Sequence, residues 1–112
     1  MEIIQEIQSG IEIFKVKGRL DSNTSTLLDE RVNKSLENGT TLMVMDFENL
    51  DYISSAGIRV ILKTVKSLKR VNGKIVLCSL QDYVQEVFQI AGFDTYLTIE
   101  QNMELAIGAV SS

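Results

Sequence analysis

Apolar and polar residues follow two patterns along the chain, and the first pattern predicts strands. Residues 42–47 form an almost wholly apolar run bounded by polar residues, which is typical of a strand covered on both faces. Near the N-terminus, isoleucines mix with polar side chains on either side of Ser9 and Gly10, a pair of the kind that closes a hairpin. The predicted strands are residues 2–8, 11–17, 42–47, 74–79 and 96–99.

The second pattern places apolar residues at steps of three and four, the spacing of helices with one buried face. The first such segment follows a polar loop at residues 18–24 and ends before Gly39. The second has its first turn at residues 54–57, and two more follow at residues 82–91 and 103–110. The side chains expected to face inward are Leu27, Leu28, Val32 and Leu36, then Ile58, Ile61, Leu62, Val65 and Leu68, then Val84, Val87, Phe88 and Ala91, and finally Leu105, Ala106 and Ala109.

The elements follow in the order β-β-α-β-α-β-α-β-α. A hairpin followed by alternating strands and helices predicts an α/β fold with a mixed, mostly parallel sheet. The chain has 112 residues, 45% of them hydrophobic, which is enough to bury a core without disulfides or metals. It contains no proline, no repeat and no low-complexity linker, so residues 1–112 are expected to form a single domain.

The histidine and cysteine content removes most common enzyme mechanisms. The only cysteine is Cys78, which lies in a predicted apolar strand and is expected to be a small buried hydrophobic side chain. The absence of histidine excludes Ser-His and Cys-His nucleophile pairs and the usual zinc sites. We therefore expect no cofactor, no metal and no enzyme activity.

Charge is distributed unevenly along the chain. The formal net charge of −4 argues against nucleic-acid binding. Residues 52–81 nevertheless contain no Asp or Glu, and Arg59, Lys63, Lys66 and Arg70 follow one face of the predicted helix. We interpret this face as solvated surface or, alternatively, as a complementary surface for an acidic partner.

No segment of the sequence predicts contact with a membrane. No apolar run reaches the roughly 20 residues that span a bilayer. The N-terminus, with Glu2 and Glu6 and no basic residue nearby, does not resemble a signal peptide. A cytoplasmic protein is expected.

Two adjacent serines, Ser54 and Ser55, mark the start of the second helix. One serine there is usually an N-cap, whose oxygen accepts a hydrogen bond from a free amide of the first turn. Two are more than a cap needs, and Ala56 and Gly57 after them are expected to leave the hydroxyl and nearby amides accessible. The positive end of the helix dipole would also tolerate a phosphate, so the arrangement suits a reversible phosphorylation switch.

The order of elements and this central motif together resemble the STAS domain, in particular the anti-sigma factor antagonists of bacteria. The most specific match is residues 46–62, which read DFENLDYISSAGIRVIL, supported by GRLD at 18–21 and NGKIVLC at 72–78. The resemblance covers essentially the whole chain. It implies a protein that, when unphosphorylated, binds an anti-sigma factor, often a serine kinase, and so releases a sigma factor. It also implies that the kinase phosphorylates the antagonist and that a metal-dependent serine phosphatase resets it.

The resemblance also implies particular site residues. The phosphoacceptor falls on Ser55, two positions before the glycine of the motif. Many members carry Asp immediately before the acceptor, and this chain has Ser54 there instead. Ser54 is therefore the second choice for the acceptor. The loop aspartate near the acceptor falls on Asp21, and a monomer that pairs with its kinase is expected. The partner-binding residues implied by the match are Asp21, Ser54, Ser55, Ala56, Gly57 and Arg59.

Carboxylates close to Ser55 would make phosphorylation repel a partner. If Asp21, Asp46 and Asp51 lie near Ser55, a phosphate adds a charge of about −1.5 to −2 to an acidic rim. Asp46 and Asp51 also admit a metal or acyl-phosphate site, as in response-regulator receivers, although capping of loops is the favoured interpretation. The main alternative function is a STAS-type scaffold or small-ligand-binding module with Ser55 unmodified, and catalysis ranks third.

Overall fold

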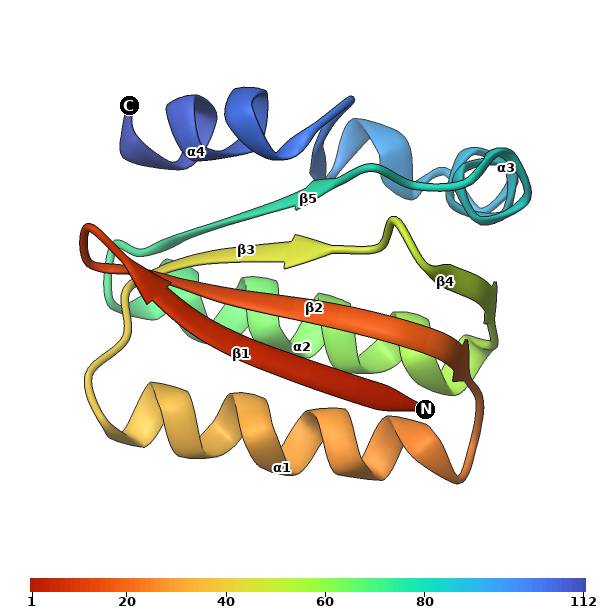
Figure 1. Ribbon diagram of the computed structural model, residues 1–112, viewed down its shortest axis with the longest axis horizontal. Helices are drawn as coiled ribbons and strands as arrows, with labels where there is room; N and C mark the ends of the chain where they lie inside the picture. The colour runs from red at the N-terminus through yellow and green to blue at the C-terminus, as the bar shows by residue number, and fades with distance from the viewer.

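One sheet of six strands organises the chain, and helices cover it on both faces (Figure 1). The computed structural model describes residues 1–112. The elements are, in chain order, β1 (Glu2–Gln8), β2 (Ile11–Leu20), α1 (Thr24–Glu37), β3 (Leu42–Asp46), β4 (Leu50–Ile53), α2 (Ser55–Arg70), β5 (Lys74–Cys78), α3 (Asp82–Ile90), the 3-10 turn η1 (Phe93–Thr95), β6 (Thr98–Glu100) and α4 (Met103–Ser111).

The pairing of the strands makes a mixed, mostly parallel sheet, as predicted. The strands lie in the order β1-β2-β3-β5-β6, and β4 pairs with β2. β1 is antiparallel to β2, whereas every other pairing is parallel. The hairpin turn uses left-handed backbone at Ser9 (φ 52°) and Gly10 (φ 79°), because a two-residue turn must match the twist of its strands.

The strand β4 is missing from the predicted order, which treated residues 48–51 as a plain connection. It forms because β2 extends to Leu20, beyond the predicted end of that strand and beyond its pairing with β3. The free edge of β2 then pairs with β4, with a shift of register between Gly18 and Arg19. The Ser54 amide continues this pairing by donating to the Leu20 carbonyl at 2.9 Å. This pairing positions the start of α2.

The helices divide the interior into two cores. α1 and α2 pack on one face of the sheet, where α3 closes the end beside β4, and α4 covers the other face (Figure 1). β3 is therefore covered on both faces, as predicted, β5 is covered in the same way, and Cys78 is fully buried. The smaller core, under α4, consists of Ile11, Ile13, Val44, Val76, Cys78, Ala106 and Val110.

Three side chains expected to face inward do not. Leu27 is 52% exposed and Leu105 48% exposed, and Ala91 lies on the surface just after α3. In α1 the buried stripe keeps Leu28 and Val32, but its other two members are serines, Ser25 and Ser35. Apolar spacing could not reveal a stripe that is half polar.

The buried Ser35 belongs to a polar network that connects α1 to the sheet. The carboxylate of Glu12, in β2, is only 7% exposed. Its Oε1 accepts from Ser35 Oγ at 2.9 Å and from Gln5 Nε2 at 2.8 Å, and Ser35 Oγ also lies 2.7 Å from Thr40 Oγ1. The network holds the C-terminal end of α1 against the β1–β2 hairpin.

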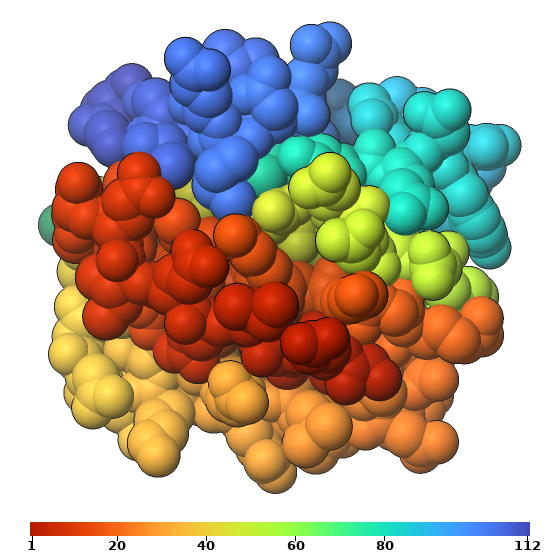
Figure 2. All heavy atoms as spheres, viewed as in Figure 1, coloured from red at the N-terminus to blue at the C-terminus, as the bar shows by residue number.

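The remaining differences lie at the ends of elements and at the edge of the sheet. β6 starts two residues later and ends one residue later than the predicted strand at 96–99, because the unpredicted η1 takes up the chain before it. Figure 2 shows β1, in red, exposed between α1 and α4, as expected for an edge strand with a single neighbour. None of the helices is both long enough and apolar enough to cross a bilayer.

Candidate functional site

The two serines at the start of α2 have different structural roles. Ser54 is the N-cap, with extended backbone (φ −98°, ψ 173°), and its Oγ accepts from the Gly57 amide at 3.4 Å. That distance is long for a hydrogen bond, so the cap is a weak one. Ser55 is the first helical residue and is exposed, whereas Ser54 is half-buried. The exposed hydroxyl at this position is therefore that of Ser55.

Gly57 serves packing, which corrects the expectation that it keeps the surface accessible. It is buried, and a Cβ built on it would lie 2.9 Å from side-chain atoms of both Leu20 and Ile53. Only a residue without a side chain lets the first turn of α2 approach β2 and β4 this closely. Ala56, which is half-buried, remains as the small residue at the surface.

Asp21 organises the loop between β2 and α1. Its Oδ1 accepts from the amides of Asn23 and Thr24 at 3.0 and 3.1 Å, and the Thr24 hydroxyl donates to the Arg19 carbonyl at 2.7 Å. The hydrogen bond from the Thr24 amide is the main cause that lowers the pKa of Asp21 below its ordinary value. Asn23, the residue just before α1, makes no side-chain cap, so Asp21 performs that function.

The first turns of α1 and α2 are brought together by the end of β2. Asp21 follows Leu20, whose carbonyl accepts from the Ser54 amide. A hollow of about 290 Å³ opens between the two helices. Its lining residues are Ser22, Ser25, Thr26, Asp29, Ala56, Arg59, Val60 and Lys63. The structure thus gathers the predicted residues Asp21, Ser54, Ser55, Ala56 and Arg59 in one region.

Arg59 and Lys63 are the cations of this region, and they differ in availability. Lys63 Nζ lies 3.1 and 3.2 Å from the two carboxylate oxygens of Asp29, in an ion pair across the hollow. Arg59 is exposed and pairs with no carboxylate. It follows Ser55 by four residues, which makes the two side chains neighbours on the helix surface.

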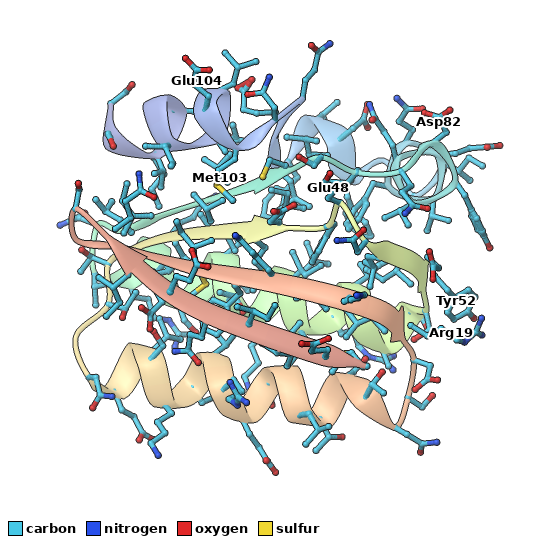
Figure 3. The ribbon with its side chains drawn as sticks, in the orientation of Figure 1. Arg19, Glu48, Tyr52, Asp82, Met103 and Glu104 are labelled. Atoms are coloured by element: carbon cyan, nitrogen blue, oxygen red, sulfur yellow. The ribbon has the colours of Figure 1, made fainter.

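A stacked pair beside the site was not predicted from the sequence. The Arg19 guanidinium lies 4.1 Å from the centroid of the Tyr52 ring, and the two side chains are seen together in Figure 3. They meet because β4 places Tyr52 next to Arg19 in the register. No local pattern signals this contact, since it depends on the unpredicted strand.

The acidic rim expected around Ser55 is smaller than predicted, because Asp46 does not belong to it. Asp46 is buried at the end of β3 and pairs in register with Lys15, five residues before Leu20 in β2, or roughly 16 Å along the strand. Its Oδ1 accepts from the Glu48 amide at 3.0 Å, which is the loop-capping role favoured from the sequence. Asp51 is exposed on β4.

Comparison with known proteins assigns the chain to a family. The family model described as the STAS domain matches residues 2–106. A relative in Bordetella bronchiseptica, BtrV, is a proposed anti-sigma factor antagonist and is 35% identical over 109 residues, which cover 97% of this chain and 94% of that protein. The chain therefore belongs to the STAS domain family.

Solved structures share the fold. A proposed anti-sigma factor antagonist from Thermotoga maritima superimposes with a TM-score of 0.93 at 20% identity, covering 98% of this chain and 95% of that one. SpoIIAA, a Bacillus cell fate determinant, was solved in its phosphorylated form and gives a TM-score of 0.77 at 22% identity, covering 97% and 99%. The relatives from Bordetella bronchiseptica and Thermotoga maritima are thus both proposed anti-sigma factor antagonists, a regulatory rather than an enzymatic class of protein.

Proposed function

We propose that this chain is an anti-sigma factor antagonist switched by phosphorylation of Ser55. In the unphosphorylated state it binds an anti-sigma factor, itself a serine kinase, and so releases a sigma factor. The observation that carries the proposal is the exposed Ser55 at the first position of α2, beside a hollow that the neighbouring helix completes. Ser54 is less suited as acceptor because it is half-buried and its oxygen accepts from the Gly57 amide.

The chemistry of the switch lies in the partners and not in this chain. The kinase transfers the γ-phosphoryl group of ATP to Ser55 Oγ, which yields phosphoserine and ADP and releases the hydroxyl proton. A metal-dependent phosphatase hydrolyses the ester with water and returns serine and inorganic phosphate. The chain acts without catalysis of its own, as a cytoplasmic monomer that pairs with its kinase.

The surroundings of Ser55 support a change in partner binding without refolding. Phosphate adds a charge of about −1.5 to −2 to the surface that a partner would cover. The free amides of the first turn and the exposed Arg59 one turn later stabilise that charge within the chain. The phosphorylated state is therefore a folded protein whose contact surface has changed in charge and bulk.

The test is phosphopeptide and intact-mass analysis after incubation with ATP and an extract of the source cells. Wild type, Ser55→Ala and Ser54→Ala are compared. Phosphate is expected on wild type and on Ser54→Ala, and it should be absent from Ser55→Ala. Phosphate that persists in Ser55→Ala would contradict the assignment of the acceptor.

The consequence for binding needs a second measurement. The anti-sigma factor is first captured with the wild-type protein. Its dissociation constants are then measured for Ser55→Asp and for Ser111→Asp, a control of equal charge at the exposed end of α4. Ser55→Asp is expected to weaken binding by at least about tenfold, because a carboxylate enters the contact surface. Equal binding by the two variants would show that charge at Ser55 is not the switch.

A further inference from the structure

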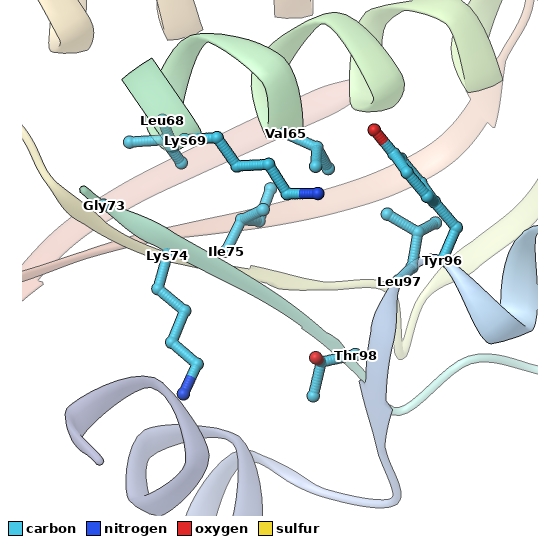
Figure 4. Close-up of a pocket in the computed structure, with 9 residues that line it drawn as sticks. All are labelled: Val65, Leu68, Lys69, Gly73, Lys74, Ile75, Tyr96, Leu97 and Thr98. Atoms are coloured by element: carbon cyan, nitrogen blue, oxygen red, sulfur yellow. The ribbon is translucent and has the colours of Figure 1, made fainter. Parts of the chain in front are cut away.

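A second surface lies further along α2, where the C-terminal half of this helix meets η1. One hollow there has a volume of about 420 Å³ and is lined by Leu62, Lys66, Gly92, Phe93, Thr95 and Tyr96. A second, of about 120 Å³, lies on the other side of Tyr96, between α2, β5 and the start of β6 (Figure 4). Tyr96 is the wall that the two hollows share.

The larger hollow has an apolar floor. Leu62 and Phe93 are half-buried, and Tyr96 keeps 45% of its surface exposed. Gly92 adopts a left-handed conformation (φ 79°) that turns the chain from α3 into η1, and it leaves the rim without a side chain. A hollow of this size accepts one aromatic or aliphatic side chain.

The rim of both hollows is positively charged. The Lys69 ammonium lies 4.7 Å from the centroid of the Tyr96 ring and points towards it in Figure 4. Lys66 is exposed at the larger hollow. Neither lysine pairs with a carboxylate, since the two ion pairs of the molecule are Lys15–Glu6 and Lys63–Asp29.

Carboxylates are scarce around these lysines although the whole protein has a net charge of −4. The segment of residues 52–81, which contains all of α2, has no acidic residue. Asp94 is the acidic residue of η1, but it is exposed and lines neither hollow. The surface therefore combines an apolar depression with cations that have no internal counterions, which suits a ligand of opposite charge.

This second surface lies on the same helix as Ser55 but is separate from the site at Ser55. Leu62 and Lys66 follow Ser55 by seven and eleven residues, close to two and three turns of helix. They therefore lie on the same side of α2 as Ser55, roughly 10 and 16 Å further along the axis. None of the residues that line the hollow between α1 and α2 lines these two.

We propose that the surface formed by Leu62, Lys66, Lys69, Phe93 and Tyr96 is a docking site for an acidic segment of a partner protein that carries one apolar anchor side chain. The anchor enters the larger hollow against Leu62, Phe93 and Tyr96. Carboxylates beside the anchor pair with Lys66 at the rim of this hollow and with Lys69, which lies over the Tyr96 ring at the smaller hollow. The site does not depend on phosphorylation of Ser55.

The experiment uses a fluorescein-labelled peptide that alternates Glu and Ser around one central Phe. Its dissociation constant is measured by fluorescence anisotropy with wild-type protein and with the double variant Lys66→Glu, Lys69→Glu. The control is Lys17→Glu, Lys34→Glu, which changes the net charge equally at exposed positions elsewhere. Amide resonance shifts locate the peptide and show that each variant is folded.

Saturable binding to wild type is expected, with shifts concentrated at Leu62, Lys66 and Tyr96. The Lys66, Lys69 variant should lose at least about tenfold in affinity, and a peptide with Ser in place of Phe should lose a similar factor, whereas the control variant should stay within about twofold. Ser55→Ala should bind the peptide like wild type, so a failure of the phosphorylation proposal leaves this result unchanged.

Three results would overturn the proposal. Equal loss in the control variant would show attraction by net charge alone. Equal affinity for the peptide without Phe would show that no anchor is bound. No saturable binding up to about 1 mM would show that the surface does not take such a segment.

Discussion

Ser54, Ser55 and Gly57 are close together in the chain, yet each is there for a different physical reason. Ser54 satisfies an amide of the first turn of α2, and Ser55 presents its hydroxyl to solvent. Gly57 allows α2 to approach Leu20 and Ile53. A motif that reads as one functional unit therefore combines a cap, a proposed modification site and a packing contact.

The packing role of Gly57 can be tested with Gly57→Ala. The added Cβ would lie 2.9 Å from Leu20 and Ile53, so the first turn of α2 must shift, and we expect a loss of about 1–3 kcal/mol in the free energy of unfolding. The measurement is urea denaturation. Gly108→Ala, in the exposed part of α4 with open space around its Cβ, is the matched control and should be stabilised by about 0.4–1 kcal/mol. Equal effects of the two substitutions would contradict the packing argument.

At the scale of elements, polar contacts decide where α1 and α2 lie. α1 is held at its start by Asp21 and at its end by Ser35, which donates to the buried Glu12. α2 is held at its start by the bond from the Ser54 amide to Leu20. Because these contacts join the ends of both helices to β2, the hollow between them has a defined shape.

Ser35→Ala tests the buried contact between α1 and β2. It removes one donor to the Glu12 carboxylate in a nearly buried position, and we expect a loss of about 1–3 kcal/mol in unfolding free energy, measured by chemical denaturation. Ser111→Ala, at the exposed end of α4, should change it by less than about 0.5 kcal/mol. If the two variants had equal unfolding free energies, the hydrogen bond from Ser35 to Glu12 would not stabilise the packing of α1 on the sheet.

At the scale of the whole molecule, two cores share one sheet, and Cys78 lies in the core under α4. Burial first, and the Asp46 carboxylate second, raise the pKa of the Cys78 thiol to about 11. A thiol at this depth becomes accessible only when the sheet or α4 opens.

Cys78 should therefore report on opening of the sheet or of α4. At pH 8 we expect iodoacetamide to label it very slowly in the native protein and rapidly in denaturant, because only the unfolded chain presents a thiolate. The pKa of this thiol is also higher in the folded than in the unfolded protein. The contribution of the thiol to the free energy of unfolding is therefore present below the ordinary pKa of 9.0 and is lost as the pH rises towards about 11. Mass spectrometry follows the labelling, and Cys78→Ala should lack this loss of stability at high pH. Rapid native labelling would contradict the burial of Cys78.

The sequence predicted the parts of the site that depend on neighbours along the chain. The steps of three and four after Ile58 located α2, and the serine pair before them located its first turn. Cys78 was correctly assigned to a buried strand for the same reason. The stripe of α1 was misjudged at Leu27, because Ser25 and Ser35 are buried through hydrogen bonds that apolar spacing does not detect.

By itself, then, the sequence determined the mixed sheet and the elements other than β4 and η1, since periodicity and capping are local properties of a chain, and its resemblance to the STAS domain made Ser55 the candidate acceptor. Only the tertiary structure decided that β4 pairs with β2, that Asp46 lies far from Ser55 and that Tyr96 meets Lys69 across the end of α2. The physical reason is register. Which residues of two distant segments lie side by side depends on how the sheet pairs and on how the helices pack against it, and no local pattern encodes that outcome.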